Sequence, residues 1–232
     1  MERIMSNQPI TSIARGLCAI LLFALLPGAA LAQSEQQKLV NAADRTLSNF
    51  LRDPDMTWLQ QHLREAKAVT IAPEVVKAGF IFGGSGGRAV TLARDPATGR
   101  WAGPAFYTLA TASVGFQAGV SVSEVVTLVM TEKGLNSLLA PSAKLGGDAS
   151  IAAGPVGAGA SSALLADFIS FARAKGVYGG VNLDGTVVTV ANDWNEAYYH
   201  KPGILPPDIL VRNTAHSKGA AKLLADVAHA GK

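Results

Sequence analysis

The sequence predicts a single α+β domain in which a curved, largely antiparallel β-sheet, barrel- or sandwich-like, carries helices at both ends. Three observations support this fold class. Apolar residues recur at helical spacing near both ends of the chain, over 34–52 and 215–230. Short β-rich runs separated by turn residues fill 69–130. The connections between these runs are too short for helical crossovers, which argues against a doubly wound parallel sheet.

The first 32 residues have the composition of a secretory signal peptide. Arg3 and Arg15 precede the apolar run of residues 17–26, and Ala30-Leu31-Ala32 provides the small residues of a cleavage site. The run is shorter than the roughly 20 apolar residues that span a bilayer. We therefore expect export and cleavage, which leaves residues 33–232 as one mature domain, periplasmic or secreted. A buried N-terminal helix is the alternative interpretation.

Cleavage would remove the single cysteine, Cys18, and this excludes disulfides, thiol catalysis and cysteine-bound metals from the mature chain. It would also remove Glu2, Arg3 and Arg15, so that the net charge falls from +3 to +2. So small a charge does not indicate nucleic-acid binding, which needs a clustered basic face. A chain with 49% hydrophobic and 16% charged residues is not disordered, and it is long enough to bury a core.

Residues 34–52 are predicted to form an amphipathic helix. Ser34 is suited to cap its first turn, with Gln37 as the capping-box partner, and Asp53-Pro54 ends it. The apolar residues on its single apolar face are Leu39, Val40, Ala43, Leu47, Phe50 and Leu51. A second helix is expected from Asp55 to about Ala66.

Strands are expected in the middle of the chain, at residues 69–71, 77–82, 88–94, 101–107, 115–120 and 125–130. We expect Pro73 to stop the first of these runs. The segment Gly83–Gly87 predicts a glycine-rich hairpin with positive φ angles, and Asp95–Gly99 predicts a turn.

The C-terminal half predicts a mixture of elements. A short helix over Glu132–Leu139 is capped by Thr131 and ended by Pro141. Residues 145–162 are almost all Gly, Ala and Ser, and they favour tightly packed strands, with a flexible linker as the alternative. The remaining expected elements are a strand or helix over 167–175, a hairpin of 177–183 with 186–191 around Asp184-Gly185, a helix start at 192–196 and a final helix over 215–230.

The chemistry-bearing motifs are weak. Gly83-Gly84-Ser85-Gly86-Gly87 matches the G-x-S-x-G nucleophile elbow, which must lie between a strand and a helix. The residues that follow, 88–92, alternate like a strand, so a serine hydrolase using Ser85 is only an alternative and we expect no catalytic residue. The four histidines, His62, His200, His216 and His229, share no metal-ligand spacing. We therefore expect neither a metal nor a cofactor.

Six segments together resemble the SYLF domain family. They are Lys77-Ala78-Gly79-Phe80, Gly103-Pro104-Ala105, Gly115-Phe116-Gln117-Ala118-Gly119, Leu145-Gly146-Gly147-Asp148, Ala152-Ala153-Gly154-Pro155-Val156-Gly157 and Lys175-Gly176-Val177-Tyr178-Gly179-Gly180-Val181. Their order and spacing fit over residues 35–212. The resemblance implies binding of anionic phospholipids and phosphoinositides, joined to actin binding in eukaryotic members. Ala166, Ala172 and Ala174 depart from the serine-rich, basic pattern of many members, which puts phosphoinositide selectivity in doubt.

The expected function is therefore non-catalytic binding of anionic phospholipid at a membrane surface, from the periplasmic side and as a peripheral protein. The helix over 34–52 would lie in the headgroup region with Lys38 and Arg45 towards phosphates. Alternatively, Lys77, Arg88, Arg173 and Lys175 would ring the mouth of a pocket on the sheet. The alternative interpretation is that the helix covers the core and these basic residues are only solvated. An envelope scaffold that binds protein or glycan is the rival function.

Overall fold

The computed structural model describes residues 33–79, 82–114, 119–155, 165–174, 177–178 and 183–230. Contacts divide the chain into residues 1–33 and residues 34–232. The predicted signal peptide, residues 1–32, lies outside the described residues, so export stays a prediction.

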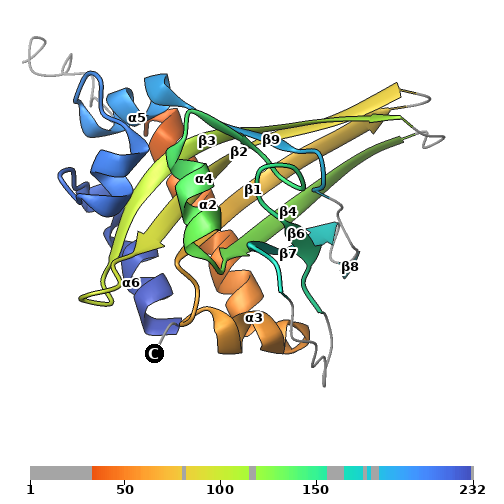
Figure 1. Cartoon of the computed structure of the whole chain (residues 1–232), viewed down its shortest axis with the longest axis horizontal. Coiled ribbons are helices and arrows are strands. Elements are labelled where there is room, and N and C mark those ends of the chain that lie inside the picture. The colour runs from red at the N-terminus through yellow and green to blue at the C-terminus, as the bar shows by residue number, and fades with distance from the viewer. Residues whose placement is uncertain are drawn as a thin grey trace, which may run out of the picture. The chain divides into compact units, whose positions relative to one another are not determined.

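Nine strands in the described part of the chain form one curled sheet (Figure 1). They are β1 (Ala68–Gly79), β2 (Phe82–Arg94), β3 (Trp101–Val114), β4 (Gly119–Val129), β5 (Ser142–Lys144), β6 (Ile151–Ala153), β7 (Phe168–Ala174), β8 (Val177–Tyr178) and β9 (Val187–Val190). Their order is β5-β9-β3-β2-β1-β4-β7-β6, with β8 paired to β7. All these pairs are antiparallel except β6 with β7. The predicted α+β class with a largely antiparallel sheet is confirmed.

The helices are α2 (Glu35–Arg52), α3 (Thr57–His62), α4 (Glu132–Leu139), α5 (Asn192–Tyr199) and α6 (Ala221–Ala230). Short 3₁₀ turns occupy Pro54–Met56 and Lys218–Ala220, and a π-turn occupies Pro207–Val211. The first and third helices begin where the sequence predicts, because Ser34 and Thr131 cap them. Their hydroxyls accept hydrogen bonds from the backbone N–H groups of Gln37 and Gly134.

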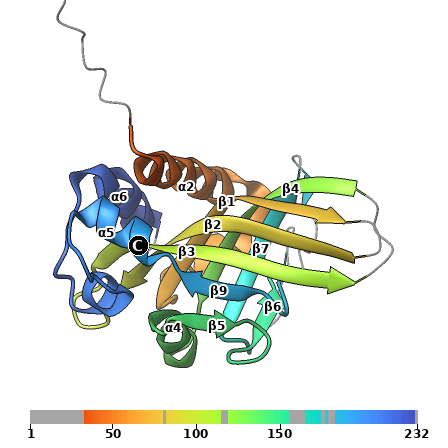
Figure 2. The ribbon, with the colours of Figure 1, turned by 90° about the horizontal axis from the view of Figure 1, so that it is seen from above.

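The sheet buries apolar side chains on both faces. On one face, the α2 face, Val69 and Ile71 of β1 pack with residues of α2, α3 and α6. On the other, the α4 face, Ala68 and Ala72 pack with α4 and the Pro207–Val211 turn. Figure 2 shows α2 and α4 on opposite sides of the strands. The two cores alternate along each strand because successive side chains of a strand point to opposite faces.

A row of hydroxyl side chains crosses the α4 face. Thr91 of β2, Thr70 of β1, Thr127 of β4 and Ser170 of β7 are opposite one another in register. All four are buried, and they hydrogen-bond in pairs, Thr70 with Thr91 at 2.9 Å and Thr127 with Ser170 at 2.7 Å. The pairing satisfies polar groups that would otherwise be unpaired in an apolar core.

The prediction that Pro73 stops the first strand was wrong. β1 continues to Gly79, and the register with β2 shifts between Ile71 and Glu74 by one extra residue in β1. Proline has no N–H to donate, and a bulge leaves a residue out of the ladder. Pro73 therefore lies at a position where the ladder requires no backbone N–H.

The prediction of a glycine-rich hairpin was also wrong. Residues 83–87 belong to strand β2, and none of these glycines has a positive φ angle. They are instead positions of close backbone approach. A Cβ on Gly87 would lie 2.3 Å from the carbonyl oxygen of Glu74, and one on Gly84 would lie 3.0 Å from that of Thr111.

The predicted hairpin around Asp184-Gly185 was wrong in its pairing. A turn is present, since Gly185 has a φ of 79° and the Thr186 N–H donates to the Leu183 carbonyl oxygen at 3.0 Å. However, β8 pairs with β7, and β9 lies between β3 and β5. Local residue types predict the turn, but they do not determine which strands its flanks pair with.

The glycine-rich segment is a strand only in part, because residues 146–148 form a turn between the isolated bridge partners Leu145 and Ala149. Residues 151–153 form β6 beside β7, and residues 156–164 lie outside the described residues. A Cβ on Gly154 would lie 2.2 Å from the ring of the buried Phe171, so tight packing is confirmed there. Residues 168–174, which fit a strand or a helix, form strand β7.

Asp167 joins α4, β6 and β7 through one buried carboxylate. Its oxygens accept from the Thr131 hydroxyl and from the Ser150 backbone N–H and hydroxyl, the latter two at 2.8 Å. These hydrogen bonds, led by that of Thr131, lower the pKa of Asp167 to about 2, and Lys133 at 3.6 Å contributes to the same effect.

We expect the ionisation of Asp167 to make the free energy of unfolding depend on pH. Because its pKa is lower in the folded state, the stabilisation is present above the ordinary value of 3.8 and is lost as the pH falls through about 2. The loss should reach roughly 2 kcal/mol of unfolding free energy. Urea unfolding across this pH range measures it. Asp167→Asn should be less stable at neutral pH and should show a correspondingly weaker acid dependence; an unchanged dependence would contradict the assignment.

Candidate functional site

One end of the sheet extends beyond the helices. Strands β1, β2, β3 and β4 project together past the elements that cover the rest of the sheet (Figures 1 and 2). Here the α2 face carries nine small apolar residues, which we call the projecting face. Its two rows are Val187, Ala110, Gly86, Val76 and Val122, and then Ala112, Gly84, Ala78 and Val120.

The projecting face is uncharged and exposed. Val120 is 68% exposed, Val122 41%, and Val76 and Val187 38% each. The glycines and alanines between these valines leave the surface without long side chains. Contiguous exposed apolar residues are typical of interaction surfaces, which makes the projecting face a candidate for one.

The next row toward α2 is polar. It contains Thr189, Thr108, Arg88 and Glu74, which are opposite one another in register. The Arg88 guanidinium lies 3.9 Å from the centre of the Trp194 ring, a cation–π geometry. A polar row that carries both Arg88 and Glu74 therefore borders the projecting face on the same side of the sheet.

A groove lies between α2 and this polar row, with a volume of about 470 Å³. The residues that line it are Glu35, Lys38, Leu39, Ala42, Arg45, Thr46, Asn49, Pro73, Glu74, Glu124 and Trp194. Beneath it, Arg173 donates from Nε to Glu124 at 3.0 Å, and the Thr46 hydroxyl donates to the same carboxylate at 2.8 Å. The volume is within the range of roughly 300–1,000 Å³ that is usual for small-molecule sites.

The α4 face has a much smaller cavity, of about 20 Å³. Thr70 and Thr127 line it together with apolar residues such as Leu109 and Phe168. A single water needs about 10–15 Å³ by this measure, so the cavity holds no more than one or two waters. The groove on the α2 face is therefore the better candidate for a ligand.

The structure separates the basic residues that were predicted to ring one pocket mouth. Arg88 and Arg173 lie on the α2 face, whereas Lys77 is opposite Ser85 and lies on the α4 face, so a single ring of these residues was wrong. Arg173 is paired with Glu124. Lys175 lies outside the described residues.

The structure instead brings residues from the two predicted elements together. Lys38 and Arg45 of α2 line the groove, and Arg88 stacks on Trp194, which lines it too. Lys38 is paired with Glu35 at 2.7 Å, and Arg45 is exposed. Sequence reasoning missed Glu74, Trp194 and the valines of the projecting face, because only the strand register shows that they are neighbours.

The apolar face of α2 is not available to a bilayer in this structure. Val40, Ala43, Leu47 and Phe50 are at most 1% exposed and belong to the core of the α2 face. The helix therefore covers the core, as the alternative interpretation had it, and insertion of this face into headgroups was wrong for the folded domain.

The hydrolase motif lacks its structural context. Ser85 lies in the middle of β2, opposite Lys77 and Thr111, and no helix follows it. A nucleophile elbow requires a sharp turn from a strand into a helix, so the Ser85 alternative was wrong.

No group of three or more His, Cys, Asp or Glu side chains in the described residues is placed to hold a metal ion. None of the helices described is long and apolar enough to cross a membrane.

Comparison with known proteins places the sequence of this chain in a family. The model of the Ysc84 family, described as "Las17-binding protein actin regulator", matches residues 110–230. An SH3 domain-containing protein of Schizosaccharomyces pombe is 32% identical over 170 residues, which cover 68% of this chain and 39% of that protein. Protein YSC84 of Saccharomyces cerevisiae is 31% identical over 144 residues, covering 59% of this chain and 30% of that protein.

A vertebrate relative gives the same result. SH3 domain-containing YSC84-like protein 1 of Xenopus laevis is 29% identical over 151 residues, which cover 62% of this chain and 45% of that protein. This chain thus aligns with less than half of the length of each of these relatives. No solved structure matches it. The family model covers more than half of this chain, and the chain belongs to the Ysc84 (SYLF) domain family.

Proposed function

We propose that this domain binds the surface of a phospholipid membrane that contains anionic lipid, without catalysis. The observation that carries the proposal is the projecting face, two uncharged, exposed rows beside the cationic residues Lys38, Arg45 and Arg88 on the same side of the sheet. Apolar residues enter the headgroup region while the adjacent cations meet phosphates.

The two components have different physical signatures. Each Lys or Arg near an anionic surface contributes roughly 1 kcal/mol, and salt screens it over a Debye length of about 10 Å at 0.1 M. Burial of valine surface contributes about 25 cal/mol per Å² and responds little to salt. Binding should therefore weaken, but not vanish, as salt rises.

Membership of the family supports the proposal, because the SYLF resemblance implies lipid binding. The rival is a scaffold that binds protein or glycan. The name of one yeast relative, LAS seventeen-binding protein 3, states LAS seventeen binding for that protein. Cosedimentation with vesicles of graded anionic content distinguishes the two functions, since a scaffold would not sediment with the vesicles.

Introducing negative charge on the projecting face tests whether this face contacts the membrane. Val120→Asp combined with Val122→Asp, in the chain from Gln33, should lower affinity for anionic vesicles by about tenfold or more, because two carboxylates then face the anionic surface. Folding should be unaffected, since both valines are exposed. Cosedimentation gives the affinity and circular dichroism gives the fold.

Val211→Asp is the matched control. Val211 is 56% exposed but lies in the Pro207–Val211 turn, away from the two rows. It should bind vesicles as the parent chain does. If the folded double variant also bound as the parent, the projecting face would not be the membrane surface.

Export remains part of the proposal, because the order of basic, apolar and Ala-x-Ala segments supports it. The intact mass of the protein from a periplasmic or secreted fraction should correspond to a chain that begins at Gln33. Recovery of the full-length chain in the cytoplasm alone would contradict export, and would leave the membrane proposal to be tested on that side.

A further inference from the structure

The groove between α2 and the polar row contains two charges of opposite sign that form no ion pair within the described part of the chain. Arg45, on α2, and Glu74, at the bulge of β1, both line it and both are exposed. Neither forms an ion pair with any of the described residues, whereas Lys38 pairs with Glu35 and Glu124 pairs with Arg173. Among the described residues, the groove thus offers one cation and one anion without an ion-pair partner.

From this arrangement we infer that the groove binds a zwitterion with a phosphate and a primary ammonium group, as in phosphoethanolamine. Arg45 receives the phosphate, for which the planar guanidinium is suited, and Glu74 accepts hydrogen bonds from the ammonium. The lipid source of this headgroup rests on the proposed membrane function. A soluble phosphoethanolamine ester has the same chemistry and is distinguished by the experiment.

The walls of the groove suit the rest of such a molecule. Leu39 and Ala42 of α2 provide apolar surface for its short carbon chain. The projecting face is on the same side of the sheet, so a headgroup in the groove belongs to a lipid whose neighbours meet the exposed valines. The bulge at Pro73 turns Glu74 to this face, next to Arg88 in register.

The same walls disfavour choline. A trimethylammonium group has no N–H to donate to Glu74, and it is recognised mainly by aromatic faces. Trp194 is the aromatic residue that lines the groove, and Arg88 already stacks on its ring at 3.9 Å. A second cation at that ring would be repelled by the guanidinium charge of Arg88.

The first test uses soluble probes without any membrane. Glycerophosphoethanolamine should bind the chain from Gln33 and shift the amide NMR signals of Arg45 and Glu74, whereas glycerophosphocholine should bind about tenfold more weakly. Glu74→Gln should remove this difference, and Arg45→Gln should weaken both probes. Equal binding of the two probes, or a preference unchanged in Glu74→Gln, would overturn the inference.

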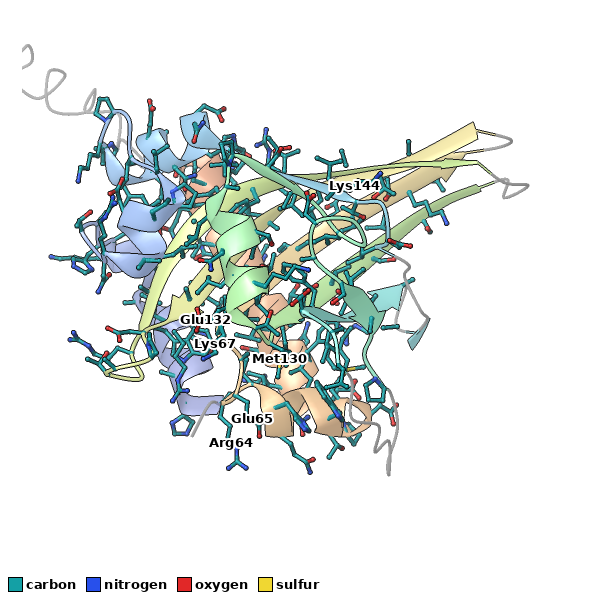
Figure 3. The ribbon with its side chains drawn as sticks, viewed as in Figure 1. Arg64, Glu65, Lys67, Met130, Glu132 and Lys144 are labelled. Atoms are coloured by element: carbon teal, nitrogen blue, oxygen red, sulfur yellow. The ribbon has the colours of Figure 1, made fainter. Side chains whose placement is uncertain are left out.

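Two residues outside the groove provide matched controls. Figure 3 shows Arg64 and Glu65 near the start of β1, where Lys67 pairs with Glu132 at 3.1 Å. Both residues are exposed and neither lines the groove. Arg64→Gln and Glu65→Gln make the same changes of charge, and they should leave probe binding unchanged.

The second test identifies the source of the headgroup. Vesicles hold a fixed fraction of phosphatidylglycerol, and the remaining lipid is either phosphatidylethanolamine or phosphatidylcholine. The parent chain should prefer the ethanolamine vesicles, and Glu74→Gln should not. Equal binding to both vesicles would overturn the lipid headgroup while leaving the membrane proposal intact. Probe binding without vesicle binding would contradict the membrane proposal and would leave a soluble ester as the ligand.

Discussion

Gly87→Ala is expected to destabilise the domain by about 3 kcal/mol. The new Cβ would lie 2.3 Å from the carbonyl oxygen of Glu74 and 3.3 Å from the Cα of Val75. Both are backbone atoms at the bulge of β1, so no side-chain rotation relieves the overlap. Urea unfolding should show a lower midpoint.

Gly86→Ala is the control, because it changes the adjacent residue of the same strand. Its Cβ would be 3.4 Å from the carbonyl oxygen of Leu109, which is an ordinary contact. Its unfolding midpoint should stay close to that of the parent. Equal loss in the two variants would mean that strand glycines matter here for backbone flexibility, and not for the space beside the bulge.

Asn195→Ala should also cost about 3 kcal/mol of unfolding free energy, since it leaves the buried N–H of Phe106 without its partner and opens a cavity in the packed core. The Asn195 side chain is fully buried. Its Oδ1 accepts from the Phe106 N–H at 2.9 Å, and its Nδ2 donates to the carbonyl oxygens of Phe106 and Ala191 at 3.3 and 3.2 Å. The amide therefore continues the edge of β3 where β9 ends. Thermal and urea unfolding measure the loss.

Two further variants make the second result specific. Asn195→Asp keeps an acceptor for the Phe106 N–H but has no N–H to donate, so it should be destabilised as well. Asn49→Ala removes an exposed amide and should change stability by less than about 0.5 kcal/mol. A stable Asn195→Ala would show that the backbone of β3 finds other partners.

Local signals predicted the helices well. Helices α2 and α4 start at the predicted residues because a capping side chain and the helix that it caps are neighbours in the chain. The contact between Asn195 and Phe106 joins residues 89 positions apart, and no local pattern predicts it. The same reason explains the Asp184-Gly185 turn, which was predicted while the pairing of its flanks was not.

The site was harder to predict because of one bulge. Alternation along a strand predicts which residues share a face, but the extra residue at Pro73 reverses that assignment for the rest of β1. Lys77 consequently lies on the α4 face, away from Arg88. Three of the basic residues proposed from the sequence lie near the groove: Lys38 and Arg45 line it, and Arg88 stacks on Trp194, which lines it too. Their acidic and aromatic neighbours are defined only by the register.

The hydroxyl row of Thr91, Thr70, Thr127 and Ser170 has a consequence for how the sheet chooses among its possible pairings. If one strand slipped by a single residue, its side chains would exchange faces, and its hydroxyl would enter the apolar core beneath α2. That hydroxyl and its former partner would both lose their hydrogen bonds, with a penalty of about 1–3 kcal/mol for each buried group. Glycine- and alanine-rich strands discriminate poorly among registers by shape alone. The four hydroxyl positions therefore make every shifted register less stable than the native one. Apolar residues at the same positions would hold the native sheet equally well but would not penalise the shifted registers.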